Sequence, residues 1–563
     1  MSKRTSIDTL MKIYLVVFLI VAVGGAWASA FLGELITPTG MPWTDPAAVW
    51  AKIRAGQFVW PSASTWIAVV LGILLFLGTA YLSVLSGSKR TRDDGLPRYK
   101  DLEKRMGRKG ALAKARQSLE LPPEATEDEM IVALCKLDGQ TLYVQHEDSM
   151  WVFAPQRSGK TLFLAVGTIL DAPGAVVVTS TKNDVLMLTA VARQRKGDVT
   201  VFDLQDISGW PETVRWNVID GCEDPDEALA RAKAWAGAQP MGDVKNGDFF
   251  NSKAAAILGR YLHAAALGGK TIEDVVRWTN DFADEEPINI LMDNHAPAAF
   301  SARLRALTTS RAGETVDSVQ ETLAGLMEPL SSPKAMRILS PAPGEGFDMR
   351  NFLAKPNTIY LLTDGERSPV APLVAMFTDF MFRKAQRISQ GMPGGRLWPV
   401  LTMVLDEAPN VAALPDMAGA LSDSGGRGIR VIGLSQSFAQ NRARWGAEAA
   451  TAIRGTSSIR LFLPGLEELD ELDKIARAAG TVKKERVSTS QGRSGSSRTT
   501  SEEERQVVRG HDIQQLPVGE AFMHYSNLPP ARVKLTPWWE RTDADQIKKD
   551  KAAAEKLVRR VSA

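Results

Sequence analysis

The stretch Ala154-Pro155-Gln156-Arg157-Ser158-Gly159-Lys160-Thr161 follows the short apolar run of residues 150–153 and precedes a second apolar run, residues 162–166. A P-loop has this order of strand, loop and helix, so that backbone N–H groups and the helix N-terminus face the β- and γ-phosphates. Lys160 then adds a positive charge, and Thr161 supplies a ligand for Mg²⁺. All eight residues are therefore predicted to bind a nucleotide.

The first position of this loop departs from the usual pattern, because Ala154 stands where a glycine is common. Alanine resists backbone angles that glycine accepts. The main steric demand of the loop falls at Gly159, which is present. A lone Gly-Lys-Thr tripeptide would be weak support, since such tripeptides also begin ordinary helices. The two flanking apolar runs supply the context that the motif requires.

A second motif lies more than two hundred residues later, where the apolar run 401–405 ends in Asp406 and Glu407 and is followed by Pro409. This pattern indicates a buried parallel strand with acidic groups at its carboxyl end. Asp406 is predicted to hold Mg²⁺ together with Thr161, and Glu407 to orient or deprotonate the attacking water. An isolated Asp-Glu pair is more often a solvated strand end. The two motifs in this order predict an ATP hydrolase that uses ATP and Mg²⁺.

Composition sets the limits of the remaining inferences. The chain has 563 residues, with 67 basic against 65 acidic side chains, so no overall basic field indicates nucleic acid. Two cysteines and five histidines show no spacing suited to metal or redox chemistry. Apolar runs at 175–179, 199–202, 358–362, 400–405, 429–434 and 458–463 alternate with helical patterns. This alternation predicts an α/β fold with a parallel sheet.

Two long uncharged segments, residues 13–32 and 66–85, each have about the 20 residues that cross a bilayer. A signal peptide is the alternative for the first, although its apolar run is long for one. Basic residues lie before the first segment and at 89–116, so both termini are expected in the cytoplasm, with residues 33–65 outside. The basic stretch 89–116 is explained by the anionic cytoplasmic leaflet.

These patterns give a predicted domain organisation. The parts are a membrane anchor with two transmembrane helices (1–90), a nucleotide-binding domain in two pieces (91–222 and 346–540), an inserted all-α domain (223–345) and a charged tail (541–563). Residues 483–505 are polar and nearly free of apolar side chains, which predicts a mobile loop. The tail mixes both charges with alanine and is expected to be a solvated helix or an interaction tail.

The combined motifs resemble a known family, the coupling-protein ATPases of type IV secretion and conjugation. The shared features are two amino-terminal apolar segments, the loop ending Arg157-Ser158-Gly159-Lys160-Thr161, a helical insertion, Leu405-Asp406-Glu407-Ala408-Pro409-Asn410, and the string GRGIRVIGLSQS at residues 426–437. Smaller similarities are Thr181-Lys182, Arg215-Trp216-Asn217-Val218, with valine where proline is usual, and the closing Thr536-Pro537-Trp538-Trp539.

The resemblance implies a RecA-like P-loop domain in a homo-hexameric ring on the bacterial inner membrane, as a multi-pass protein. Its implied partners are a relaxase or relaxosome with single-stranded DNA and the components of a type IV secretion channel. Gln436 is implied to lie beside the γ-phosphate, although a polar residue on a turn is the simpler reading. The family's arginine finger indicates Arg427, with Arg430 as the alternative and an ordinary solvated charge as the competing reading.

Three functions stay open at this stage. The first is a coupling ATPase that moves relaxase-bound DNA in conjugation. The second is a coupling ATPase that exports protein effectors only. The third is a membrane scaffold whose altered P-loop binds nucleotide without turnover.

Overall fold

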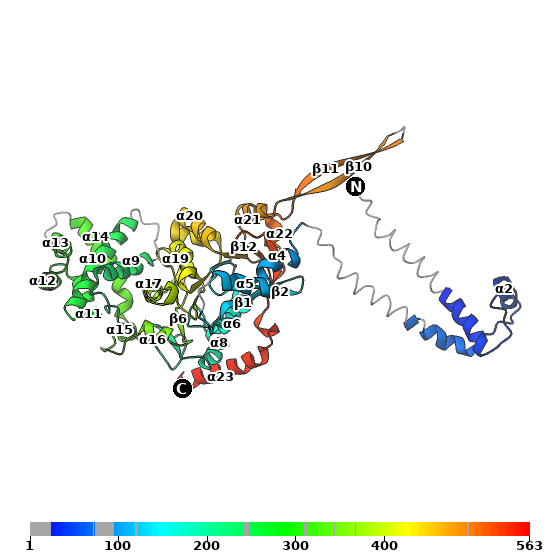
Figure 1. Cartoon of the computed structure of the whole chain (residues 1–563), viewed down its shortest axis with the longest axis horizontal. Helices are drawn as coiled ribbons and strands as arrows, with labels where there is room; N and C mark the ends of the chain where they lie inside the picture. The colour runs from blue at the N-terminus through cyan, green and yellow to red at the C-terminus, as the bar shows by residue number, and fades with distance from the viewer. Residues whose placement is uncertain are drawn as a thin grey trace. The chain divides into compact units, whose positions relative to one another are not determined.

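The computed structural model describes residues 24–70, 72–73, 95–118, 122–239, 247–308, 313–342, 344–365, 368–492 and 495–562. The chain divides into two compact units (Figure 1). The smaller comprises Met1–Gly95 and Thr481–Val507, and the larger comprises Leu96–Gly480 and Val508–Ala563. Each unit is described by itself below.

The larger unit is built on an 11-stranded sheet in the order β2-β1-β13-β12-β9-β3-β8-β7-β4-β6-β5. Its strands are β1 (Ile131–Leu137), β2 (Gln140–Gln145), β3 (Met150–Phe153), β4 (Val176–Ser180), β5 (Val199–Asp203), β6 (Thr358–Leu362), β7 (Leu401–Leu405), β8 (Ile429–Ser435), β9 (Ile459–Phe462), β12 (Glu520–Tyr525) and β13 (Ala531–Lys534). All neighbouring pairs from β9 to β5 are parallel. The predicted parallel α/β sheet is thereby confirmed.

Helices connect and cover these strands. After the P-loop, a π-helical turn, Thr161–Ala165, leads into α7 (Val166–Asp171). The other helices of the larger unit outside the segment between β5 and β6 are α4 (Tyr99–Met106), α5 (Arg108–Ser118), α6 (Glu127–Met130), α8 (Asp184–Gln194), α17 (Ala371–Gln390), α18 (Ala408–Val411), α19 (Met417–Asp423), α20 (Phe438–Thr456), α21 (Leu469–Ala476), α22 (Gly510–Gln514) and α23 (Ala544–Ser562).

An antiparallel extension of the sheet was not predicted. Strands β12, β13, β1 and β2 continue it beyond β9 through antiparallel pairs only. A local signal for part of it was present, because Asp138 and Gly139 join β1 to β2 with φ of 51° and 80°. An Asp-Gly pair between two strand-like runs is a strong signal for a hairpin.

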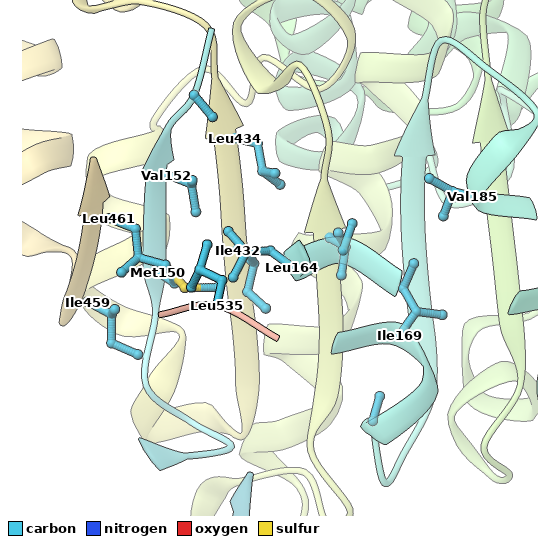
Figure 2. Close-up of a cluster of buried hydrophobic side chains, with 14 of the residues drawn as sticks. Met150, Val152, Leu164, Ile169, Val185, Ile432, Leu434, Ile459, Leu461 and Leu535 are labelled. Carbon is cyan, nitrogen blue, oxygen red and sulfur yellow. The ribbon is translucent and has the colours of Figure 1, made fainter. Parts of the chain in front are cut away.

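The main core lies beneath the parallel strands (Figure 2). Met150 and Val152 of β3 and Ile432 of β8 belong to one buried cluster with Leu164 and Ile169 from the helical segment after the P-loop. Every residue of β3, β4, β6, β7 and β8 is buried. Strands covered on both faces read as continuous apolar runs, which is why the sequence revealed them.

The segment between β5 and β6 contains helices and, in its described part, no strand. These helices are α9 (Pro225–Gly237), α10 (Gly247–Leu267), α11 (Ile272–Asn280), α12 (Glu286–Asp293), α13 (Ala298–Thr308), α14 (Gly313–Met327), α15 (Pro333–Leu339) and α16 (Met349–Leu353). In Figure 1, α10 to α14 gather at one end of the larger unit, on the far side of α17 from β1 and β2. The helical content of 223–345 is as expected from the sequence.

The predicted mobile loop at 483–505 is wrong. Residues Thr481–Gly492 and Gly495–Gln506 form the antiparallel strands β10 and β11. Frequent Thr, Ser and Val residues suit extended backbone, and the register sets Lys483 opposite Glu504. The prediction of a loop relied on the lack of apolar residues, but a two-stranded ribbon can form without an apolar run.

The predicted membrane topology needs correction. The proposed spans 13–32 and 66–85 fall largely on residues 1–23, 71 and 74–94, which lie outside the described residues. Among the residues that are described, no helix has both the length and the apolar character to cross a membrane. This finding overturns the multi-pass inner-membrane assignment.

The charged tail is not a free solvated helix. Helix α23 packs along α8, with Ile547 buried among Val166, Leu170 and Leu188. Asp550 makes a two-point ion pair with Arg195, at 2.9 and 2.7 Å. The apolar stripe that fixes this helix is hidden in the sequence by the surrounding lysines.

Candidate active site

The predicted phosphate loop closes over the carboxyl end of β3. The N–H of Ala154 donates to the carbonyl of Ser435 at 2.8 Å, and the Ser158 hydroxyl donates to the carbonyl of Pro155 at 2.7 Å. Gln156 and Arg157 are exposed, whereas Ser158 is buried. Ala154 and Ser158 are therefore held by hydrogen bonds, whereas Gln156 and Arg157 face solvent.

Left-handed backbone angles occur within this loop at Arg157 (φ 62°) and Gly159 (φ 88°), and not at Ala154. A Cβ on Gly159 would lie 2.5 Å from the ring of Phe163. Gly159 is thus required by both conformation and space. Ala154 is fully buried in an ordinary conformation, so the missing first glycine does not distort the loop.

Lys160 meets the second motif directly. Its Nζ lies 3.0 Å from Oδ1 of Asp406 and 3.6 Å from Oε1 of Glu407. The contact follows from the sheet order, because β3 and β7 both flank β8 in parallel, so that their carboxyl ends adjoin. The three side chains are only 12, 9 and 17% exposed, so the charges interact with little solvent screening.

The two carboxylates are held by backbone geometry. Glu407 adopts φ 53° and ψ 44°, a left-handed conformation that is uncommon for a residue with a Cβ. Its N–H donates to Oδ1 of Asp406 at 3.1 Å, and the Thr179 hydroxyl donates to the Asp406 carbonyl at 3.1 Å. Strain of this kind concentrates where a side chain must be aimed.

Gln436 lies at the same edge, immediately after β8. Its Nε2 donates to Oε1 of Glu407 at 3.1 Å, and its own N–H donates to Oε1 of Gln440 at 3.0 Å. The structure therefore brings Lys160, Asp406, Glu407 and Gln436 together at one edge of the sheet.

Arg427 is not brought to this site. It ends a 3₁₀ turn, Gly425–Arg427, ahead of β8 and forms an ion pair with Asp423. Because β8 runs parallel to β3, Arg427 lies at the amino edge of the sheet, opposite the edge that carries Lys160. Within one chain its guanidinium cannot serve the P-loop.

Arg430, the alternative arginine, is part of the core. It is 2% exposed, and its Nε donates to the carbonyl of Asp148 at 3.3 Å. Burial lowers the pKa of its guanidinium to about 10. A group enclosed in this way is not available to a neighbouring subunit.

The carboxy-terminal residues that contact the P-loop helix were not predicted from the sequence. The ring of Trp539 lies edge-on to that of Phe163, with centroids 5.6 Å apart. Arg541 makes a two-point ion pair with Asp171, at the end of α7, at 2.8 and 2.7 Å. The Trp538-Trp539 pair was the available signal, but its partner could be found only in three dimensions.

The residues present suit a nucleotide with its metal. Nζ of Lys160 is buried against the carboxylates of Asp406 and Glu407, and phosphate oxygens would take the place of these carboxylates as its partners. Thr161 begins the helical segment beside it. A hydroxyl and one carboxylate are the few protein ligands that Mg²⁺ takes when phosphates complete its shell.

This chain is similar to two known proteins, one of them in two solved structures. The conjugal transfer protein TraG of Escherichia coli is 23% identical over 417 residues, which cover 68% of this chain and 64% of TraG, so the match spans just under two thirds of that relative. The bacterial conjugative coupling protein TrwB, in an unbound form, is 17% identical with a TM-score of 0.56, covering 75% of this chain and 91% of TrwB. The plasmid coupling protein TrwB in complex with ADP and Mg²⁺ is 16% identical with a TM-score of 0.54, covering 76% and 92%.

The structural likeness establishes the fold. The family follows from the sequence, because the model described as "Type IV secretory system Conjugative DNA transfer" matches residues 114–561. That range includes the P-loop, the Asp406-Glu407 motif, Gln436 and the helix that closes the chain. This protein therefore belongs to the conjugative DNA transfer family of type IV secretory systems.

Proposed function

We propose that this protein hydrolyses ATP to drive the transfer of relaxase-bound single-stranded DNA into a type IV secretion channel. The single observation that carries the proposal is the meeting of Lys160 with Asp406 and Glu407 at the carboxyl edge of the sheet. Ligands of open parallel sheets bind at this edge.

The proposed roles follow from charge and position. Lys160 and the loop amides hold and neutralise the phosphates, and Glu407 orients or deprotonates the attacking water. Gln436 fixes the Glu407 carboxylate through its 3.1 Å hydrogen bond and responds when that carboxylate moves. Thr161 and Asp406 are the proposed Mg²⁺ ligands.

ATP and Mg²⁺ are the proposed cofactors, and the complex of TrwB with ADP and Mg²⁺ supports them. The metal would supply charge neutralisation at the transferring phosphoryl group. Lys160 and the loop amides position the phosphates, and Glu407 positions the attacking water.

A ring of identical subunits, a homo-hexamer, is the proposed assembly. Its support is the position of Arg427, which cannot reach its own P-loop and is suited to a neighbour's. A finger supplied in this way contributes about 10³ to 10⁵ in rate in known cases. The helices of residues 223–345 are proposed as an inserted domain within the nucleotide-binding domain.

The test is ATP hydrolysis by the full chain with and without single-stranded DNA. Lys160→Ala should abolish hydrolysis, whereas Lys548→Ala, which removes an exposed lysine on α23, should leave it unchanged. Stimulation by DNA supports DNA transfer. Hydrolysis that DNA leaves unaltered favours protein effectors as the cargo, and a complete lack of hydrolysis leaves a nucleotide-binding scaffold.

A further inference from the structure

A cavity of about 370 Å³ lies against β3 on the side of the sheet that α20 and α21 cover. Phe153 and Phe438, with Ala447 and Ala450, form its apolar wall, and polar side chains of α20 and α21 form the remainder. Successive strand residues point to opposite faces, so Phe153 faces this cavity while Val152 belongs to the core beneath the P-loop helix. The cavity is therefore separate from the phosphate loop, although Phe153 immediately precedes Ala154.

Asn441 is the most unusual residue of the lining. It is 1% exposed, and neither its amide nitrogen nor its amide oxygen has a hydrogen-bond partner among the described residues. Buried amides are almost always paired, so an unpaired amide at the wall of a cavity calls for an explanation. A side-chain amide offers one donor edge and one acceptor edge, the combination with which asparagine recognises the edge of a nucleobase.

The mouth of the cavity carries more positive than negative charge. A single carboxylate, Glu471, is shared by Arg454 at 2.9 Å, Lys474 at 3.1 Å and Arg442 at 3.7 Å. Burial lowers the pKa of the nearby Arg460, and the charge of Arg454 lowers it further. One acid cannot neutralise these cations, so an anionic group is favoured at the rim.

The shape of the site decides how a planar ligand would lie. Phe153 and Phe438 stack on each other with centroids 4.2 Å apart, and the Arg454 guanidinium lies over Phe438 at 5.8 Å. Phe438 therefore already has Phe153 and the Arg454 guanidinium as neighbours. A base would contact the edges of the rings, with its hydrogen-bonding edge toward Asn441 and its phosphate toward the arginines and Lys474.

We propose that this cavity binds one nucleotide unit, with the base paired to Asn441 and the phosphate held by Arg442, Arg454 and Lys474. The unit is either a free nucleotide or one nucleotide of a single strand. Its walls adjoin both catalytic motifs, because Phe153 leads into the P-loop and Phe438 follows Gln436 by two residues. Occupancy of the cavity would therefore bear on the site where ATP is proposed to react.

The test measures binding by fluorescence anisotropy in the full chain carrying Lys160→Ala. The probes are a fluorescent adenosine monophosphate, which lacks the β- and γ-phosphates that a P-loop holds, and a fluorescein-labelled oligodeoxyadenylate. Asn441→Leu should weaken binding about tenfold, the effect expected for losing buried hydrogen bonds to a ligand. Asn289→Leu, at an exposed position on α12, is the matched control and should bind normally.

Two further readouts separate binding from folding. The unliganded Asn441→Leu chain should unfold at the same temperature as its parent or higher, because leucine leaves no unpaired polar atom. Lys474→Glu, at a position 60% exposed, should weaken binding in a salt-dependent manner.

The two probes distinguish the sources. Saturable binding of the monophosphate supports a free nucleotide, and binding of the oligonucleotide alone supports a strand. Binding of neither probe, or equal binding by the Asn441→Leu and Asn289→Leu chains, overturns the proposal. The assay involves no hydrolysis, so its outcome is independent of the proposed ATPase function.

Discussion

The amide of Gln436 donates a 3.1 Å hydrogen bond to Glu407, and the same carboxylate lies 3.6 Å from Lys160. One acidic group is thus shared between the lysine that the P-loop supplies and a glutamine from the neighbouring strand end. Any ligand that draws Lys160 away changes the surroundings of Glu407 and, through it, of Gln436. Glu407 thus links Lys160 to Gln436, whose own N–H donates to Gln440 of α20.

Glu407→Gln should lower kcat for ATP hydrolysis by about 10² to 10⁴, the usual contribution of a general base. The amide keeps the size of the side chain and a hydrogen bond to Gln436, so nucleotide affinity should change little. Steady-state hydrolysis and equilibrium binding of a fluorescent nucleotide measure the two effects. Glu467→Gln, at an exposed position, is the control, and equal rates in both variants would exclude Glu407 as the base.

Gly159→Ala should reduce nucleotide affinity at least about tenfold, because the new Cβ meets the Phe163 ring at 2.5 Å and the backbone is left-handed. Gly221→Ala is a matched control, since Gly221 has φ +83° with nothing within 4 Å of an added Cβ. It should lose stability from backbone strain and keep its affinity. A similar loss of affinity in both chains would show that the P-loop contact is not the cause.

Ala154→Gly should leave hydrolysis within about threefold of the parent while lowering the free energy of unfolding by about 1 kcal/mol. The reason is that Ala154 is fully buried and does not use the backbone freedom that glycine offers. Urea denaturation and the hydrolysis rate check the two parts. A large gain in activity would mean that alanine does constrain the loop.

Arg541→Gln should lower both stability and nucleotide affinity, because the ion pair with Asp171 anchors the end of the P-loop helix. A double-mutant cycle with Asp171→Asn should give a coupling energy of about 1 kcal/mol in the free energy of unfolding. The pair Arg195 and Asp550 also joins the tail to the body, but through α8. Arg195→Gln should therefore cost stability without changing affinity.

The stability of the folded chain should fall in mild acid. Burial, aided by Arg430, lowers the pKa of His146 to about 3, and burial with Arg460 and Arg454 lowers the pKa of His524 to about 4. The pKa of a histidine in the unfolded chain is about 6.5. Below that pH the unfolded chain binds protons at these two histidines and the folded chain does not, so the free energy of unfolding decreases as the pH falls from about 6.5 to 4. His524→Gln should reduce the slope by up to about 1.4 kcal/mol per pH unit, measured from urea unfolding curves at several pH values. An unchanged slope would contradict the assignment.

Local sequence was sufficient for the parallel part of the fold and for the chemistry at its edge. The strands around Val178, Tyr360, Val404 and Ile432 were recognisable because residues buried on both faces must be apolar along their whole length. The P-loop was recognisable because the roles of Gly159 and Lys160 depend on residue type and on immediate neighbours in the chain. Even the pairing of Lys160 with Asp406 could be foreseen, since parallel strands end at one edge.

Features that depend on distant partners were not recognisable. The pairing of β12 with β9, the pairing of β13 with β1 and the docking of α23 on α8 all join segments that lie far apart in the chain and show no matching local pattern. The two arginine candidates illustrate the difference, because Arg427 and Arg430 look equivalent in sequence. Only the position of each relative to the sheet separates a surface charge at the amino edge from a buried core residue.

The sequence by itself determined which residues form the nucleotide loop, which acids accompany it and which family the chain resembles, because these depend on residue type and short spacing. The tertiary structure alone decided that Ala154 is tolerated, that Glu407 is shared by Lys160 and Gln436, and that Asn441 lies unpaired beside a cavity. Those properties depend on side-chain burial and backbone angles, which arise only when segments hundreds of residues apart pack against one another.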